Sequence, residues 1–436
     1  MELSSAEKEF KNIRKLLQDH HEMFSNAIPL IASENICSPA VREAIITDLS
    51  HRYAEGVAGQ RVYAGCEFID QIELKCIELA KKYWRAGFAD VRAISGVVAN
   101  LIVYTGLTKP GDKMMAMPIP QGGHISHNRT AANVHGLNVD FFEFDEEEMN
   151  LDVDKSIKKL KEFKPKLVLF GASVFLFPHP VKELSEVAKD VGAYSMYDGA
   201  HVAGLIGSGY FQQPLEEGAD VFTLSTHKTF PGPQHGCVLA IEDEDLNKKL
   251  RLAAFPSLLS NHHLHNVAGL AITLTEMLKF GKEYHRQVIK NAKALAQSLN
   301  ERGIEVLAEK KGFTESHTII ADISKLSKTI GWGDKVEEIL EKARIILNRN
   351  LIPKDIKEKR SFRTPSGIRL GTPEVTRLGM KESEMDYIAE LIERVVIKKE
   401  DIESVKKLVK EFRQDFQEVK YCFKSKTKAY QYIGIH

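Results

Sequence analysis

The stretch KLVLFGASVFLFPHPVKELSEVAKDVGAYSMYDGA (166–200) contains two apolar runs separated by an amphipathic segment. The spacing predicts a strand over 166–175, a helix over 181–192 and a second strand over 193–200. Two further apolar runs, DVFTLST (220–226) and GCVLAIE (236–242), follow as predicted strands. Short apolar strands in alternation with helices favour a mainly parallel sheet covered on both faces, so the fold class is α/β.

Helical and strand-like spacing extends this arrangement to the rest of the chain. Helices are predicted over 4–24, 70–85, 95–107, 265–303, 333–344, 383–397 and 402–417, and strands over 318–324 and 367–371. The tail KAYQYIGI (428–435) is also strand-like. At 436 residues the chain is long for one core. We therefore divide it into an N-terminal helical arm (1–27), a large domain (28–275), a smaller C-terminal α+β domain (276–400) and a C-terminal extension (401–436).

The composition excludes several classes of protein. The 60 basic residues balance the 60 acidic ones, which gives no electrostatic case for binding nucleic acid. The first eighteen residues are charged throughout, and no apolar run reaches the roughly 18 residues of a membrane span. The five cysteines are scattered without a C-x-x-C pair, so we expect reduced structural thiols, no metal and a cytoplasmic protein.

Three polar groups lie where a ligand of an open α/β sheet would bind, beyond the carboxyl ends of strands. Asp198 and His201 follow the predicted strand 193–200, and Lys228 follows 220–226. Ser95 and Gly96 begin a helix whose free N–H groups could hold an anion. Taken singly, the aspartate could be a turn residue, the lysine a surface group and the serine a helix cap. Together they match what pyridoxal phosphate requires, namely a Schiff-base amine, a carboxylate for the pyridine nitrogen and a phosphate site.

Several motifs in one order resemble the serine hydroxymethyltransferase family, and details are closest to its archaeal branch. They are LIASENICS (30–38), HRYAEGVAGQRVYAG (51–65), ISGVVAN (94–100), GGHISH (122–127), YDGAHVAGL (197–205), STHKTFPGP (225–233) and PSGIRLGTPEVTRLGM (365–380). The resemblance implies a fold-type-I pyridoxal-phosphate transferase with a mainly parallel seven-stranded sheet. It also implies a homodimer with shared active sites, and serine and glycine as substrates. The one-carbon carrier would be tetrahydrofolate or tetrahydromethanopterin.

The resemblance also assigns site residues. Lys228 would form the Schiff base, Asp198 would face the pyridine nitrogen, and His124 would stack on the ring. Arg369 and Ser33 would bind the substrate carboxylate, and Glu55 and Tyr63 would reach the reacting carbons from the second subunit. The remaining cofactor contacts would come from Ser95, Gly96, Ser173, His201, Ser225, His227 and, across the interface, Tyr53. A weaker match places Ile119, Ile125 and Asn350 at the pterin.

The sequence departs from the family pattern at four places. Val97 replaces a second phosphate-site serine, and Gln234 with His235 replaces an arginine and a glycine. The segment 257–261 lacks the usual glycine pair, and Ala58 replaces a proline in the loop that contains Glu55. We expect the latter loop to be more mobile as a result.

These departures keep two other functions open. One is a pyridoxal-phosphate aldolase or transaldolase that acts on β-hydroxy or α-methyl amino acids without a pterin. The other is a non-catalytic paralogue that retains the fold for binding. The histidines at 262, 263 and 265 could suggest a metal, but no carboxylate or thiol has ligand spacing beside them, so we expect interface or phosphate-side packing instead.

Overall fold

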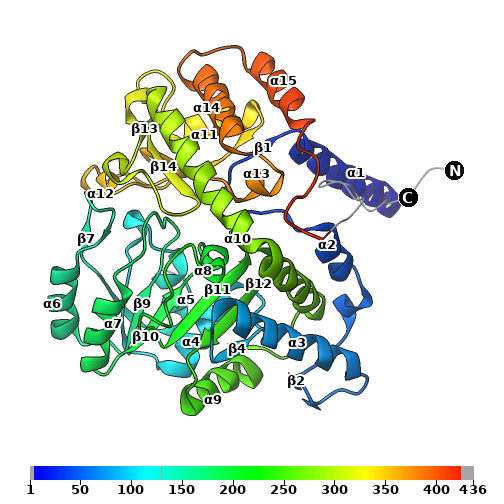
Figure 1. Cartoon of the computed structure of the whole chain (residues 1–436), viewed down its shortest axis with the longest axis vertical. Helices are drawn as coiled ribbons and strands as arrows, with labels where there is room; N and C mark the ends of the chain where they lie inside the picture. Colours follow the sequence, from blue (N-terminus) through cyan, green and yellow to red (C-terminus); the bar gives the residue numbers. More distant parts are fainter. Residues whose placement is uncertain (1–3, 129, 424–436) are drawn as a thin grey trace.

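The computed structural model describes residues 4–128 and 130–423. Its largest sheet has seven strands in the order β4-β12-β11-β10-β9-β5-β6 (Figure 1). The bounds are β4 (Phe88–Asp90), β5 (Lys113–Ala116), β6 (Asn138–Phe141), β9 (Leu167–Phe170), β10 (Tyr194–Asp198), β11 (Val221–His227) and β12 (Pro231–Ala240). The five strands from β11 to β6 are parallel, which confirms the predicted α/β class.

Helices cover both faces of this sheet, because its strands are apolar on both sides. Phe222 and Leu224 of β11 face one buried cluster, and Val221 faces the other. The first cluster is closed by α3 (Glu67–Trp84), α6 (Val153–Phe163), α7 (Val181–Asp190), α8 (Ala203–Ser208) and the first part of α10 (Leu264–Glu301). The second is closed by α4 (Gly96–Leu107), α5 (Ala131–His135) and α9 (Glu244–Leu252).

Two of the predicted strands differ from the observed ones. The predicted strand 166–175 ends at Phe170, and the chain then forms a loop that contains Ser173. The predicted strand 236–242 begins earlier, at Pro231, and β12 pairs antiparallel with both β11 and β4. The two prolines at 231 and 233 therefore belong to a strand and not to a loop. The Pro233 carbonyl accepts a hydrogen bond from the Thr226 hydroxyl at 2.5 Å, which ties the turn between the two strands.

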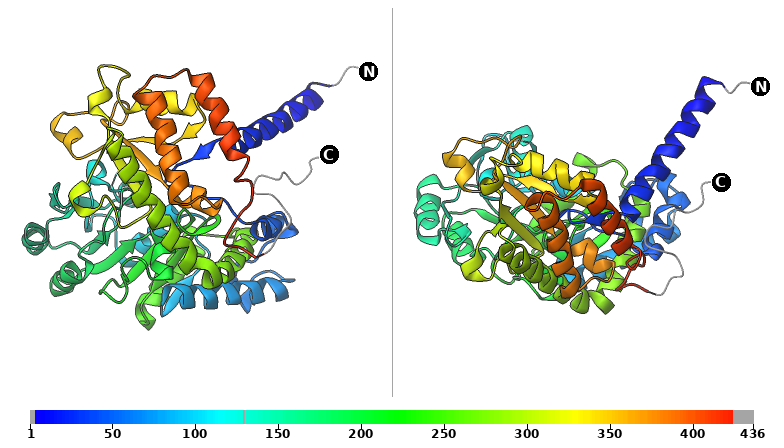
Figure 2. Two further views of the ribbon diagram at one scale, coloured as in Figure 1. Left: turned by 45° about the horizontal axis from the view of Figure 1, so that its top comes forward. Right: turned by 90° about the horizontal axis from the view of Figure 1, so that it is seen from above.

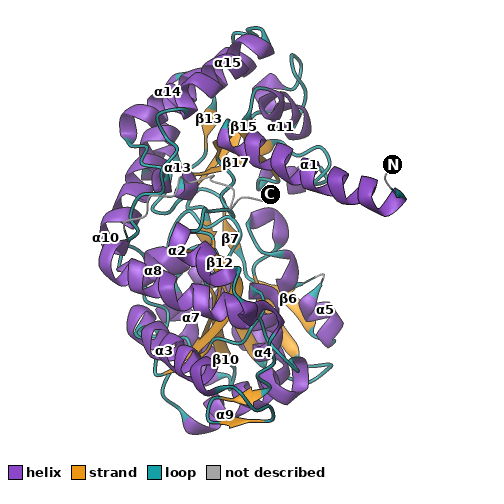
Figure 3. Ribbon diagram, turned by 90° about the vertical axis from the view of Figure 1, so that its right-hand side faces the viewer, coloured by secondary structure: helices purple, strands orange, loops and turns teal. Residues whose placement is uncertain are grey.

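A second, four-stranded antiparallel sheet forms the C-terminal part of the chain, in the order β13-β14-β17-β16. The strands are β13 (Glu305–Val306), β14 (Thr318–Asp322), β16 (Asn348–Asn350) and β17 (Gly367–Gly371). They pack with the last part of α10, α11 (Gly333–Lys342), α14 (Glu382–Val396) and α15 (Ile402–Arg413). Figure 3 shows α10 alongside both sheets, so the predicted domain limit at 276 falls inside one continuous helix.

The N-terminal helix α1 (Ser5–Ser25) extends away from the body of the chain and buries none of its residues (Figure 2). Its apolar residues Phe10, Ile13, Leu16 and Leu17 are exposed. The chain then joins the C-terminal part, where β1 (Ile28–Pro29) pairs parallel with β15 (Ile345–Ile346).

Shorter elements complete the chain. They are α2 (Pro39–Ile45), α12 (Lys354–Lys357), α13 (Pro373–Arg377), the pair β2 (Gly56–Val57) and β3 (Gln60–Arg61), and the pair β7 (Phe144–Asp145) and β8 (Asn150–Leu151). None of the helices in the part of the chain that is described is both long and apolar enough to cross a membrane. The tail 428–435, predicted as strand-like, lies outside the described residues.

Candidate active site

Lys228 and Asp198 reach the same edge of the large sheet. Asp198 is the last residue of β10, and Lys228 directly follows β11, the parallel neighbour of β10. Asp198 pairs in register with Thr223 of β11. Lys228 is partly buried, and its Nζ donates a hydrogen bond to Ser225 Oγ at 3.3 Å. Burial lowers the pKa of the Lys228 ammonium to about 8, because it outweighs the opposing attraction of Asp198. A larger fraction of neutral, nucleophilic amine results.

Asp198 is 7% exposed and is held by two donors that sequence reasoning did not find. Its Oδ2 accepts hydrogen bonds from His127 Nε2 at 2.8 Å and Asn100 Nδ2 at 2.7 Å. Burial alone would raise the pKa of Asp198, but the hydrogen bond and charge of His127 hold it well below its usual value. The carboxylate therefore stays ionised and can face a cation.

His127 and Asn100 act as supports for this carboxylate. Asn100 accepts in turn from Thr223 Oγ1 at 2.7 Å. The sequence offered only weak signals for these two residues. Asn100 is a polar residue within an otherwise apolar predicted helix, and His127 is the second histidine of GGHISH. The contact of His127 with Asp198 was not predicted from the sequence.

The start of α4 forms a narrow cradle beside Lys228. Ser95 caps this helix, since its Oγ accepts from Val98 N at 3.2 Å. A methyl group on Gly96 would overlap Ser225 Oγ, so only glycine allows the helix to approach β11 this closely. His227 follows Ser225 by two residues at the end of β11. The buried Nδ1 atom of His227 has no hydrogen-bond partner within the described residues.

His124 and His201 are both held as neutral rings. Burial lowers the pKa of His124 to about 4, and its Nδ1 lies 2.7 Å from Ser126 Oγ. Burial also places the pKa of His201 well below its ordinary value. The His201 ring stacks on His317 with centroids 5.6 Å apart, a contact that the sequence did not predict. Both rings can donate or accept a hydrogen bond without adding charge.

Arg369 projects from β17 into a cavity of about 790 Å³. Ser33, Ser173 and His124 also line it, together with Ile119, Ile125 and Asn350. The guanidinium donates one hydrogen bond, from Nη1 to the Ser173 carbonyl at 3.1 Å, and its buried Nε has no partner within the described residues. Burial lowers the pKa of Arg369 to about 10, and no carboxylate among the described residues compensates for it. A guanidinium with free N–H donors of this kind can bind a carboxylate ligand through two parallel hydrogen bonds.

Tyr53, Glu55 and Tyr63 lie elsewhere on the chain and do not line this cavity. The two tyrosine rings are exposed and contact each other with centroids 5.1 Å apart. Glu55 lies between them in sequence and is partly buried. One chain therefore brings together the cofactor and carboxylate residues but leaves these three at its surface.

The residues at the sheet edge fit pyridoxal phosphate. The Nδ1 atom of His227, which has no partner within the described residues, and the N-terminus of α4 beside it could hold a phosphate. Lys228 and the ionised Asp198 could supply the amine and the counter-charge for the ring. The fold and this site define the class of fold-type-I pyridoxal-phosphate enzymes.

A sequence model described as serine hydroxymethyltransferase matches residues 6–392. The chain belongs to the serine hydroxymethyltransferase family. It is 53% identical to serine hydroxymethyltransferase of Nitrosopumilus maritimus over the whole of both chains. It is 54% identical to that of Korarchaeum cryptofilum, with 97% of this chain and 99% of the other covered, and 52% identical to that of Methanocaldococcus jannaschii, with 98% and 100% covered. The family implies pyridoxal phosphate and a folate-type co-substrate, and neither alternative function is favoured by these matches.

The departures from the family pattern have identifiable surroundings. His235 is buried, and its Nε2 lies 2.6 Å from the Val91 carbonyl, while burial lowers its pKa to about 3. The added ring is thus neutral and fills the core beneath the sheet edge. The Ser257 hydroxyl donates to the Leu252 carbonyl at 2.8 Å. No group of three potential metal ligands occurs among residues 4–128 and 130–423.

Proposed function

We propose that this protein catalyses the reversible interconversion of serine and glycine and transfers the one-carbon unit to a reduced pterin, either tetrahydrofolate or tetrahydromethanopterin. The observation that supports this most strongly is the unpartnered Nε of Arg369 in a cavity shared with Ser33 and His124. A free amino acid is a small carboxylate ligand that such a site can bind and orient.

Pyridoxal phosphate would be held by Lys228 through its ε-amino group, and by Ser95, Gly96, Ser225 and His227 around its phosphate. When bound, it supplies an electron-withdrawing ring that stabilises negative charge on the α-carbon of the amino acid. Asp198 keeps that ring charged, because its carboxylate remains ionised at neutral pH. His124, as a neutral ring, covers the cofactor without competing for that charge.

Arg369 would bind the substrate carboxylate and so orient the amino acid relative to the cofactor, because the orientation of the bound amino acid controls which bond to its α-carbon reacts. Breaking the bond between the α- and β-carbons of serine requires a proton to leave the β-hydroxyl. We assign that proton transfer to the carboxylate of Glu55, with Tyr63 beside it. Ile119, Ile125 and Asn350 line the same cavity as Arg369 and offer an apolar wall with one amide for the flat pterin ring.

Glu55, Tyr53 and Tyr63 do not line the cavity of their own chain, so we assign them to the site of the second subunit in a homodimer. The exposed aromatic surface of Tyr53 and Tyr63 and the apolar face of α1 support such an interface. The division into an arm (1–27), large domain (28–275), smaller domain (276–400) and extension (401–436) stays part of this proposal.

The test is an assay of purified, pyridoxal-phosphate-loaded protein with glycine, formaldehyde and each reduced pterin separately. Serine formation that requires a pterin supports the proposal, and the pterin with the higher kcat/KM identifies the carrier. Cleavage of β-hydroxy amino acids without any pterin-dependent serine formation would refute it in favour of an aldolase.

A further inference from the structure

Two consecutive side chains, Ser260 and Asn261, contact the loop that contains Glu55. Ser260 Oγ donates to Glu55 Oε1 at 2.5 Å. Asn261 accepts from the Ala54 amide at 3.0 Å through Oδ1, and its Nδ2 donates to the Arg52 carbonyl at 3.1 Å. This segment stands where the family pattern has glycines, and its polar side chains face Glu55 and the backbone just before it.

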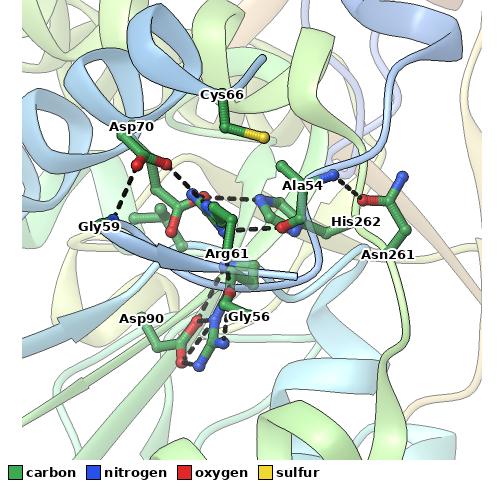
Figure 4. Close-up of polar contacts among 12 residues, drawn as sticks. Ala54, Gly56, Gly59, Arg61, Cys66, Asp70, Asp90, Asn261 and His262 are labelled. Atoms are coloured by element: carbon green, nitrogen blue, oxygen red, sulfur yellow. Dashed lines mark hydrogen bonds and ion pairs between the residues drawn. The ribbon is translucent and has the colours of Figure 1, made fainter. Parts of the chain in front are cut away.

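Arg61 holds the backbone on both sides of Glu55. Its Nη1 donates to the Ala54 carbonyl at 2.7 Å and to the Gly56 carbonyl at 2.9 Å (Figure 4). The Arg61 side chain is 3% exposed, so these bonds are shielded from water. Arg92 adds a weaker bond to the Gly56 carbonyl at 3.4 Å, and is itself paired with Asp90. The carbonyls of the residues directly before and after Glu55 are thus fixed by guanidinium groups.

Two carboxylates fix Arg61 in turn. Asp70 Oδ1 accepts from Arg61 Nε at 2.7 Å, and Glu73 Oε2 forms an ion pair with Nη2 at 2.8 Å. His262 Nε2 lies 2.8 Å from the same oxygen of Glu73 (Figure 4). The third residue of the 260–262 segment therefore supports Arg61 through Glu73, while the first contacts Glu55 directly.

Hydrophobic burial explains only a small part of the position of this loop. Ala54 is buried beside Cys66 and Leu264, but the larger apolar side chains are exposed, with Val57 at 38%, Val62 at 71% and Tyr63 at 44%. A loop with so little buried apolar surface depends on its polar contacts for a defined conformation. Charged groups that are buried and paired favour one geometry over others, even where they add little to stability.

We propose that Arg61 and the side chains of Ser260, Asn261 and His262 are positioning residues that fix the carboxylate of Glu55 for proton transfer. This inference rests on the proposed function, in which Glu55 moves a proton. None of the four residues contacts the reacting atoms. They act through Glu55. Arg61 holds the carbonyls of Ala54 and Gly56, Asn261 holds the Ala54 amide, and Ser260 holds one carboxylate oxygen of Glu55.

A double-mutant cycle tests this. Arg61→Lys and Ser260→Ala are measured in the wild type and in the Glu55→Gln background, by pterin-dependent serine–glycine interconversion. Arg61→Lys keeps the charge but loses the fork, and we expect kcat to fall about 100-fold, since misplacing a reacting group by about 1 Å has effects of that size. For Ser260→Ala we expect about a tenfold fall, and for both variants a KM for serine within about threefold of the wild type. Neither change should lower kcat further when Glu55 is already replaced. Equal losses in both backgrounds would mean a general structural role and overturn the proposal.

His262 offers a rescue experiment. His262→Gln retains a donor for Glu73 and should keep most of the activity, whereas His262→Leu should lose about tenfold in kcat. Equal activities of these two variants would count against the proposal. Ser257→Ala is the matched control, because Ser257 lies three residues before Ser260 and its hydroxyl donates to the Leu252 carbonyl. It should behave as the wild type.

Hydrogen exchange separates failure of this inference from failure of the proposed function. If the wild type has no pterin-dependent activity, the proposed function fails, and the amide of Ala54 still reports on the loop. Arg61→Lys should speed its exchange at least tenfold while the far-ultraviolet circular dichroism stays unchanged. An unchanged exchange rate would show that Arg61 does not fix the loop.

Discussion

His127 Nε2 lies 2.8 Å from Oδ2 of Asp198, and both side chains are buried at the edge of the large sheet. This contact keeps a carboxylate ionised where burial would favour its neutral form. Its consequences, and those of the surrounding site, can be measured.

Replacement of His127 by alanine should weaken binding of pyridoxal phosphate. Loss of a hydrogen bond to a buried charge costs about 1.5–3 kcal/mol, which corresponds to roughly 10- to 100-fold in the dissociation constant. Titration of the apoprotein with the cofactor, followed by visible absorbance, measures this. His127→Gln, which retains a donor, should lose less; an unchanged affinity of His127→Ala would contradict the role of this contact.

Attachment of pyridoxal phosphate to the apoprotein should accelerate with pH and level off above about pH 8. The neutral amine is the nucleophile, and a pKa of about 8 leaves roughly one Lys228 in ten neutral at pH 7, against fewer than about one in a thousand at the ordinary value. Stopped-flow absorbance from pH 6 to 10 gives the profile. A rate that still rises tenfold per pH unit above pH 9 would show that Lys228 is not perturbed. Lys228→Ala should form no such absorbance.

Replacement of Arg369 by lysine should raise the KM for serine by about 100-fold, because an ammonium cannot match a carboxylate with two parallel donors. Steady-state kinetics at saturating pterin measure this. Arg363→Lys is the control, since Arg363 is exposed and outside the cavity lining, and it should leave KM unchanged. A similar KM for Arg369→Lys and the wild type would remove Arg369 from the carboxylate site.

Mixed dimers should reveal whether active sites are shared. A heterodimer of one Lys228→Ala chain and one Glu55→Gln chain contains one complete site if Glu55 serves the partner. It should then retain about half the wild-type activity, although the Lys228→Ala homodimer is inactive and the Glu55→Gln homodimer keeps only a small residual activity. Two affinity tags allow the heterodimer to be purified before assay. An inactive heterodimer would place Glu55 in its own chain's site.

Much of the fold could be predicted from local spacing. The helix over 265–303 was predicted within two residues of α10, because its apolar positions recur at helical intervals. The direction and start of β12 could not be predicted in this way. Its prolines suggested a loop, but the missing N–H groups are tolerated next to the irregular pairing at Ser225 and His227.

The site was predicted where one residue type has a distinctive chemical role. Lys228, Asp198 and Arg369 are such residues. Lys228 and Asp198 lie at the ends of neighbouring strands and Arg369 lines a cavity, and their roles stay predictions. Residues that act through another side chain gave no such signal. Nothing in the sequence singled out Asn100. His262 was expected to pack at an interface or near a phosphate, which stays a prediction, and its contact with Glu73 was not foreseen. Only long-range contacts define roles of that kind.

Helix α10 contributes side chains to the hydrophobic cores of both parts of the chain. Leu274 and Met277 belong to the core beneath the large sheet, whereas Leu295 and Leu299 belong to the C-terminal core. Unfolding of this helix would remove buried apolar side chains from both cores at the same time. The chain should therefore denature as one cooperative unit, with a single calorimetric endotherm in place of one peak for each compartment.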